Sequence, residues 1–126
     1  MIGLNKILYA EDEGDIREIA TLALETFGDL ETVTCESGVQ VIDLALSFQP
    51  QLILLDVMMP GMDGPTTLKV LNSHKQLKSI PVIFLTAKIL PDEIERFKSL
   101  GAIAVISKPF DPMTLADQIK QIWAEL

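Results

Sequence analysis

The chain lacks features on which several classes of protein depend. It has one cysteine, Cys35, so it cannot form an internal disulfide, and a reducing compartment fits. No stretch approaches the roughly 18 uninterrupted apolar residues of a membrane span. Residues 1–6 are too short and too weakly basic to open a signal peptide. These absences predict a cytoplasmic protein in which Cys35 is a small strand or loop residue rather than a reactive thiol.

Basic residues and histidine are also scarce. Lys and Arg number 10 against 18 Asp and Glu, which gives a formal net charge of −8. Such a surface repels nucleic-acid phosphates, so we do not expect direct nucleic-acid binding. The single histidine, His74, lies in the polar stretch 72–76, where a solvated side chain is expected rather than a phosphorelay or metal-binding histidine.

What the chain does contain is an alternation of short apolar runs and amphipathic segments. Its 126 residues, 48% of them hydrophobic, suit one domain spanning 1–126. Runs that are apolar at consecutive positions indicate strands buried on both faces, as in a parallel sheet covered by helices. The five predicted strands are 7–10, 32–34, 52–55, 82–85 and 103–106.

Each apolar run precedes a segment with helical spacing of its apolar residues. The first of these helices is expected to end near Gly28, the third to follow Pro65, and the fourth to stop at Gly101, a usual place for a C-terminal glycine. The apolar faces of the five predicted helices are formed by Ile16, Ile19, Ala20, Ala23 and Phe27; Val41, Ile42, Ala45 and Leu46; Thr67, Leu68 and Leu71; Ile94 and Phe97; and Leu115, Ile119, Ile122 and Leu126.

Two helix N-termini carry recognisable capping patterns. The spacing of Ser37 and Gln40 resembles a capping box before the second helix. Asp111 is a candidate N-cap of the last helix, with Pro112 as its first helical residue. The complete pattern predicts an α/β fold in which a βα unit is repeated five times, with a doubly wound parallel sheet and right-handed crossovers.

Polar side chains follow four of the predicted strands at their carboxyl ends, where open α/β sheets place their functional crevice. Each residue alone has an ordinary explanation: Asp56 as a turn residue or cap, Thr86 as a β-branched strand end, Lys108 as a solvated loop lysine. Their joint occurrence at one sheet edge favours a site. The residues concerned are Glu11 and Asp12 after the first strand, Asp56 after the third, Thr86 after the fourth and Lys108 after the fifth.

The types of these residues suggest a phosphoryl-transfer site. Clustered carboxylates such as Glu11, Asp12 and Asp56 repel one another unless a positive charge lies among them. Mg²⁺ suits such oxygen ligands and commonly takes one or two carboxylates. With Lys108 and Thr86 nearby, Asp56 could act as a nucleophile and hold a phosphoryl group as an acyl phosphate.

Four segments carry a resemblance to a known family over nearly the whole chain. They are 8–13 (LYAEDE), 54–64 (LLDVMMPGMDG), 81–87 (PVIFLTA) and 107–110 (SKPF). In this order and at these strand ends, they resemble the receiver domain of two-component response regulators. The resemblance implies a CheY-like, flavodoxin-like sheet of strand order 2-1-3-4-5.

The resemblance also implies roles for individual residues. Asp56 would accept a phosphoryl group from a histidine kinase or a histidine phosphotransfer protein. Asp12 would bind Mg²⁺ directly, Glu11 would bind it through a water, and the backbone carbonyl of Met58 would complete the protein ligands, which include Asp56. Lys108 and Thr86 would contact the phosphoryl group. The small Ala87 would leave Asp56 accessible, and Pro109 resembles the family's cis-proline.

Two positions depart from the family pattern. Val105 stands where members often carry Tyr or Phe, so we expect a subtler rearrangement between Ala87 and Phe110 in place of an aromatic switch. Met58 and Lys88 occupy positions that often tune attack of water on the acyl phosphate, and their side chains predict slow to moderate self-dephosphorylation.

Three functions remain open from the sequence. A phosphorylation-dependent switch fits the complete set of residues, and such a protein is not an enzyme beyond its own phosphorylation and dephosphorylation. A Mg²⁺-dependent phosphohydrolase usually offers a second Asp where this chain has Met58, and an inactive receiver-like module normally lacks one of the site residues. As a switch, the chain would be a monomer or weak dimer. The resemblance implies that it meets a downstream partner or output domain through its fourth helix, fifth strand and fifth helix. Trp123 is expected to flank the core, and a stand-alone regulator or a piece of a longer chain both fit.

Overall fold

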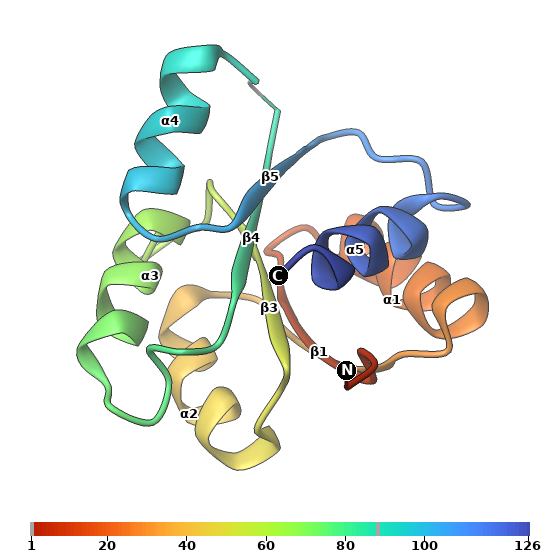
Figure 1. Cartoon of the computed structure of the whole chain (residues 1–126), viewed down its shortest axis with the longest axis horizontal. Helices are drawn as coiled ribbons and strands as arrows, with labels where there is room; N and C mark the ends of the chain where they lie inside the picture. Colours follow the sequence, from red (N-terminus) through yellow and green to blue (C-terminus); the bar gives the residue numbers. More distant parts are fainter. Residues whose placement is uncertain (1, 88) are drawn as a thin grey trace.

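In the computed structural model, which describes residues 2–87 and 89–126, strands and helices alternate along the chain (Figure 1). The strands are β1 (Lys6–Ala10), β2 (Glu31–Cys35), β3 (Leu52–Asp56), β4 (Val82–Thr86) and β5 (Ala104–Ser107). The helices are α1 (Gly14–Gly28), α2 (Gly38–Phe48), α3 (Gly64–Ser73), α4 (Pro91–Ser99) and α5 (Leu115–Ala124). The strand and helix order expected from the hydrophobic pattern is therefore confirmed.

The strands form one parallel sheet in the order β2-β1-β3-β4-β5, as predicted. Their registers align the carboxyl ends, since Ala10 pairs with Cys35 and Leu55, and Thr86 pairs with Ser107. The inner strands β3 and β4 are buried along their whole length, whereas the edge strands β2 and β5 are not. A continuous apolar run thus marks the strands that lie between two neighbours and two helix layers.

Helices cover both faces of the sheet, with α1 and α5 together on one side and α2, α3 and α4 on the other (Figure 1). The core on the α1/α5 side consists of Leu4, Ile7, Tyr9, Ala20, Leu24, Leu30, Leu52, Leu54, Ile83, Leu85, Ile106, Leu115, Ala116 and Ile119. Trp123 packs against this core and donates a hydrogen bond from Nε1 to the Ile2 carbonyl at 2.9 Å, so the expectation that it flanks the core is confirmed.

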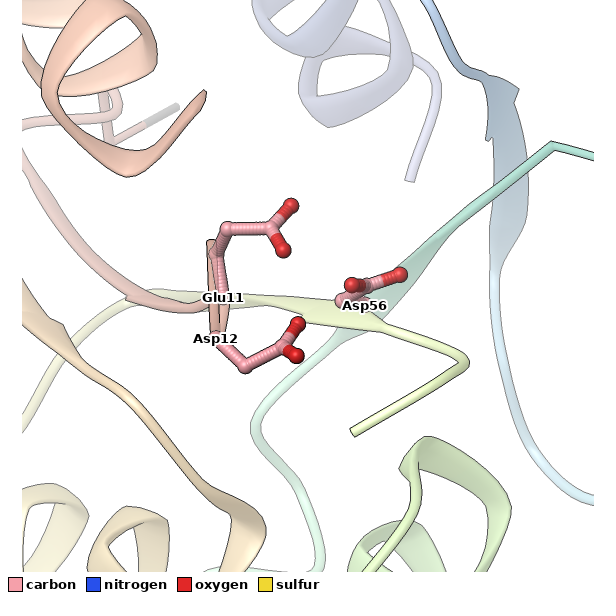
Figure 2. A group of neighbouring side chains, drawn as sticks. All are labelled: Glu11, Asp12 and Asp56. Atoms are coloured by element: carbon pink, nitrogen blue, oxygen red, sulfur yellow. The ribbon is translucent and has the colours of Figure 1, made fainter. Parts of the chain in front are cut away.

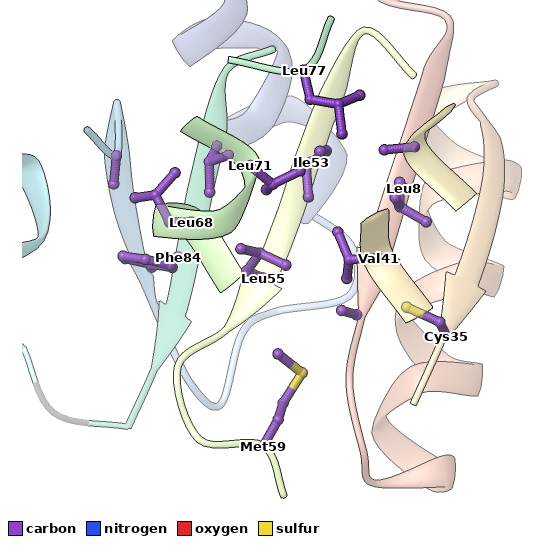
Figure 3. Close-up of a cluster of buried hydrophobic side chains, with 14 of the residues drawn as sticks. Leu8, Cys35, Val41, Ile53, Leu55, Met59, Leu68, Leu71, Leu77 and Phe84 are labelled. Carbon is purple, nitrogen blue, oxygen red and sulfur yellow. The ribbon is translucent and has the colours of Figure 1, made fainter. Parts of the chain in front are cut away.

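The opposite core lies beneath α2, α3 and α4, and it includes the side chain of Met59 from the loop after β3 (Figure 3). Its buried residues are Leu8, Ala10, Cys35, Val41, Ala45, Ile53, Leu55, Met59, Leu68, Leu71, Leu77, Val82, Phe84, Phe97 and Ala102. The expectation that Cys35 is an ordinary strand residue is confirmed, because it is a buried member of β2 whose thiol pKa is raised by burial to about 11. None of the helices in the described part of the chain is long and apolar enough to cross a membrane.

The predicted apolar face of the first helix is partly wrong. Ile19 and Phe27 are 49% and 55% exposed, whereas Leu24 joins Ala20 and Ala23 in facing the core. The buried stripe of α1 therefore runs through Ala20, Ala23, Leu24 and Gly28, and Ile19 and Phe27 lie beside it. Leu46 and Leu126, also predicted on core-facing positions, are exposed as well.

The two predicted caps also differ from the structure. Ser37 is the N-cap of α2 but makes no side-chain cap bond, and Gln40 Oε1 instead accepts from the backbone N–H of Glu36. Asp111 caps a turn through the N–H of Met113, and α5 begins only at Leu115, so Asp111 and Pro112 precede the helix. The turn from 111 to 114 makes its own backbone bonds to the Asp111 carbonyl, which delays the regular helix.

Other boundary features agree with local chemistry. Gly101 follows α4 with φ of +119°, a backbone conformation that glycine adopts easily, as its predicted C-terminal role requires. Asp63 is the N-cap of α3 and accepts from the N–H of Thr66 at 2.8 Å, with Pro65 in the first turn. His74 is the C-cap residue of α3 and is half-buried, so it is less exposed than the solvated side chain expected from the sequence.

Candidate functional site

Three carboxylates meet at the carboxyl edge of the sheet. Glu11 and Asp12 follow β1, and Asp56 is the last residue of β3, which is the neighbour of β1 (Figure 2). Carboxylate oxygens of all three lie within 4.8 Å of one another. Glu11 and Asp56 are buried and Asp12 is exposed, so the cluster opens to solvent on the Asp12 side.

Lys108 joins the two buried carboxylates. Its Nζ lies 2.9 Å from Glu11 Oε1 and 3.2 Å from Asp56 Oδ2. The lysine follows β5, two strands away from β3, and its backbone N–H donates to the Thr86 carbonyl at 2.9 Å. The sheet therefore brings together residues separated by almost the whole chain, as the sequence predicted for Glu11, Asp12, Asp56 and Lys108.

Glu11 is held by more partners than the sequence indicated. The Tyr9 hydroxyl donates to Oε1 at 3.1 Å, and the backbone N–H of Glu13 donates to Oε2 at 3.2 Å. Arg17 of α1 donates to the Glu11 carbonyl at 2.8 Å. Tyr9 could have been found from the alternation of a strand, which places residues two apart on the same face, whereas nothing in the sequence pattern pointed to Arg17.

The buried charges shift one another's protonation. Burial and the adjacent Glu11 carboxylate raise the pKa of Asp56 to about 7, although Lys108 opposes the shift. Burial alone would raise the pKa of Glu11, but the hydrogen bonds that it receives hold it below its ordinary value. Burial would lower the pKa of Lys108, yet its two carboxylate partners raise it. Of the two carboxylates Glu11 and Asp56, it is thus Asp56 that gains or loses a proton near neutral pH.

Thr86, Met58 and Lys88 are the remaining residues predicted to act at the site. Thr86 is buried at the end of β4, directly beside β3 in the sheet. The side chain of Met58 is 76% exposed and lies in solvent. The next residue, Met59, is buried and anchors the same loop in the core. Lys88, expected to affect dephosphorylation, lies outside the described residues.

The loop after Asp56 returns tightly to the start of α3. Val57 donates to the Leu85 carbonyl, and the N–H of Gly64 donates back to the Val57 carbonyl at 2.9 Å. A β-carbon on Gly64 would lie 2.7 Å from the Asp56 carbonyl oxygen and 3.0 Å from Val57 Cα. Only glycine allows this approach, so Gly64 lets the loop close behind the Asp56 backbone.

A mainly apolar pocket of about 380 Å³ adjoins the carboxylate cluster. It lies between α1 and the segment after β5, with Lys108 on its wall. The peptide bond between Lys108 and Pro109 is cis, as expected for Pro109. The lining residues are Ile16, Ile19, Ala87, Lys108, Pro109, Phe110 and Pro112.

Comparison with known proteins identifies the family. Residues 7–120 match the family model of the response regulator receiver domain. The chain belongs to this family. It is therefore a receiver domain of the two-component response regulators, whose members are typically non-enzymatic signalling modules, and its acidic cluster is consistent with a phosphorylation site.

Curated proteins align with most of the chain. The sporulation initiation phosphotransferase F of Bacillus subtilis is 34% identical over 117 residues, which cover 92% of this chain and 91% of that protein. The phosphate regulon transcriptional regulatory protein PhoB of Pseudomonas aeruginosa is 36% identical over 122 residues, 97% of this chain and 52% of that protein. The chain spans about half the length of several of the curated relatives that it matches.

Solved structures confirm the CheY-like fold. The chemotaxis response regulator CheY4 of Vibrio cholerae superimposes with a TM-score of 0.87 at 28% identity, covering 94% of this chain and 98% of that one. The strand order 2-1-3-4-5 agrees with the expectation from the sequence.

The donor set of this receiver domain fits a hard divalent cation. Glu11, Asp12 and Asp56 form the acidic triad typical of a receiver Mg²⁺ site, and all their ligand atoms are oxygens. Membership of the family also implies a histidine kinase or phosphotransfer partner.

Proposed function

We propose that Asp56 accepts a phosphoryl group from a histidine kinase or a histidine phosphotransfer protein, and that this modification switches the binding of a downstream partner. The observation that carries the proposal is the position of Lys108, which lies within hydrogen-bonding distance of both Asp56 and Glu11. An ammonium group placed there can stabilise the negative charge of the free carboxylate and, after phosphorylation, that of the phosphoryl oxygens.

In the proposed reaction, an Asp56 carboxylate oxygen forms a bond to phosphorus as the bond from phosphorus to the histidine nitrogen of the donor breaks. Asp56 must be ionised to attack, and its pKa of about 7 leaves it partly protonated near neutral pH. Lys108 then turns from Glu11 toward the new phosphoryl oxygens, and the Thr86 hydroxyl donates to one of them.

The proposed metal is Mg²⁺. Asp12, Asp56 and the Met58 backbone carbonyl would hold it directly and Glu11 would hold it through a water, and when bound it supplies positive charge to the phosphoryl oxygens.

The apolar pocket beside Lys108 is the surface that we assign to the phosphodonor. It adjoins the acceptor, and the exposed side of Ile19 and the ring of Phe110 give it an apolar lining. A helix carrying the phosphohistidine could pack there while its imidazole reaches Asp56.

Output is proposed to pass through α4, β5 and α5. Val105 lies in a shallow groove of about 410 Å³ on this face. Ile89, from the loop before α4, and Gln118 and Ile122 of α5 line the same groove. Because valine cannot swing as an aromatic ring does, we infer that the response involves smaller shifts between Ala87 and Phe110.

We propose that residues 1–126 form one receiver domain, acting as a monomer or weak dimer in the cytoplasm. Met58 carries no group that could act as an acid or base beside Asp56, which favours a switch with slow to moderate self-dephosphorylation over a phosphohydrolase. An acyl-phosphate lifetime of seconds in Mg²⁺ would contradict this.

The proposal can be tested with acetyl phosphate and Mg²⁺, followed by intact-mass measurement. Wild-type protein should gain one phosphoryl group, and Asp56→Asn should gain none. The matched control is Asp63→Asn, because Asp63 is an exposed carboxylate of the same loop whose helix-capping oxygen an asparagine retains. Phosphorylation of the Asp56→Asn variant at the wild-type rate would refute the assignment.

A further inference from the structure

The single tyrosine of the chain links the hydrophobic core to the acidic site. The Tyr9 ring is fully buried on the α1/α5 side of the sheet, yet its hydroxyl reaches Glu11 Oε1 at 3.1 Å. The same oxygen accepts from Lys108 Nζ at 2.9 Å. A fixed neutral donor and a movable cation therefore share one carboxylate oxygen.

We propose that Tyr9 is a positioning residue, which holds the Glu11 carboxylate in its metal-binding orientation and keeps it hydrogen-bonded when Lys108 turns toward the phosphoryl group. This inference rests on the proposed function, since it concerns the same site. It assigns a task to a core side chain that touches neither the acceptor nor the expected metal.

Without the Tyr9 hydroxyl, Glu11 would lose a donor to Oε1. Glu11 is fully buried, and a buried carboxylate oxygen without a donor is costly. When Lys108 leaves, Tyr9 is the remaining side-chain donor to Oε1 within the described residues, while the Glu13 N–H continues to hold Oε2.

Tyr9 is well suited to this task because it cannot follow Lys108. Its ring packs among the buried side chains of the α1/α5 core, so the hydroxyl has little freedom to move. The hydroxyl also adds no charge, so it does not compete electrostatically with a cation at the site. Residues that bind through such fixed partners commonly depend on them for metal affinity.

The test is a titration of the Tyr9→Phe variant with Mg²⁺ in the absence of any phosphodonor. Binding is monitored through the backbone amide chemical shifts by NMR. We expect roughly ten-fold weaker Mg²⁺ binding than in the wild type. The control is Trp123→Phe, which also removes one aromatic hydrogen bond to the chain, but at the opposite end of the sheet. It should bind Mg²⁺ like the wild type.

A second measurement separates positioning from a merely structural role and does not require the variant to fold. Because Tyr9 is the only tyrosine, protein labelled with ¹³C at the hydroxyl-bearing ring carbon gives a single resonance. The chemical shift of that resonance should change on addition of Mg²⁺, with the same midpoint as the backbone amide shifts. It should change again on addition of beryllofluoride, which mimics a phosphoryl group.

Either of two results would overturn the inference. The first is a Mg²⁺ affinity of Tyr9→Phe within about two-fold of the wild type. The second is a tyrosine resonance whose chemical shift changes with neither Mg²⁺ nor beryllofluoride. These outcomes are distinct from failure of the proposed function, which would show as wild-type protein that binds Mg²⁺ but gains no phosphoryl group on Asp56.

Discussion

The two ends of the sheet satisfy their polar side chains in different ways. At the amino end, side chains pair with the backbone: Lys6 Nζ donates to the Phe48 carbonyl, Gln51 Oε1 accepts from the N–H of Asn5, and Trp123 donates to the Ile2 carbonyl. At the carboxyl end, the carboxylates of Glu11 and Asp56 both pair with the side chain of Lys108, although Glu11 also accepts from the backbone N–H of Glu13.

This difference gives a physical reason why the proposed switch would operate at the carboxyl end of the sheet rather than at the amino end. A bond to a backbone carbonyl is tied to the position of the chain, so a ligand cannot redirect it without moving the fold. Bonds among charged side chains can be redistributed when a cation or a phosphoryl group arrives, because each charge needs a partner but not a particular one. The comparison predicts larger and more ligand-dependent effects of mutation at the carboxyl end.

The largest expected effect is that of Lys108→Ala. It leaves two buried carboxylates without their shared cation, and we expect a loss of about 4 kcal/mol in the free energy of unfolding without metal. Added Mg²⁺ should recover part of this loss. Urea denaturation with and without Mg²⁺ measures both, and Lys120→Ala, at an exposed lysine of α5, is the control. A loss that Mg²⁺ does not reduce would show that bonds at the carboxyl end are not redistributed when a cation binds.

The next effect concerns pH. The pKa of Asp56 is raised from 3.8 to about 7, so the folded chain keeps a proton that the unfolded chain has already released. Stability should therefore fall as pH rises toward 7. Relative to Asp56→Asn, which has no such proton, the wild type should lose on the order of 3 kcal/mol between about pH 5 and about pH 8. A stability difference between the two proteins that stays constant with pH would contradict this assignment.

A smaller effect is expected for Gly64→Ala. The added β-carbon would press on the Asp56 carbonyl, and relief requires movement of backbone rather than of a side chain. We expect a loss of about 2 kcal/mol in unfolding free energy, together with slower phosphorylation by acetyl phosphate. Gly3→Ala is the control, because nothing lies within 4 Å of a β-carbon there. Equal behaviour of the two variants would rule out the close approach.

The smallest effect should come from the amino end. Trp123→Phe removes one hydrogen bond to a backbone carbonyl, worth about 1 kcal/mol in unfolding free energy. Because this bond is tied to the chain rather than to a ligand, phosphorylation by acetyl phosphate should keep the wild-type rate. A changed rate would show that the two ends of the sheet are coupled.

Much of the fold could be predicted because the buried strands of a parallel sheet appear in the sequence as short apolar runs. Strands β3 and β4 are buried on both faces and appear as unbroken apolar runs. Side-chain details were harder to predict. Ile19 and Phe27 lie near the buried stripe of α1 and yet point outward, because periodicity gives the phase of a helix only to within about one residue.

The candidate site divides in the same way. Glu11, Asp12, Asp56, Thr86 and Lys108 could be identified because each follows a predicted strand, and the carboxyl ends of parallel strands meet at one edge. Tyr9 and Arg17 were missed, since a tyrosine in a strand and an arginine in a helix are ordinary there. The contact of Tyr9 follows from strand alternation, whereas that of Arg17 with the Glu11 carbonyl depends on how α1 packs against the end of β1.

The sequence by itself determined the order of strands and helices, the residues at the carboxyl edge and the resemblance to receiver domains. These follow from local patterns of hydrophobicity and from the residue types at strand ends. That Lys108 bridges Glu11 and Asp56 could be learned only from the folded chain. These contacts join residues 97 and 52 positions apart, and their distances depend on the packing of the whole sheet rather than on any local pattern. The contact of Tyr9 with Glu11 is local in sequence, but only the fold shows that the tyrosine ring lies in the core.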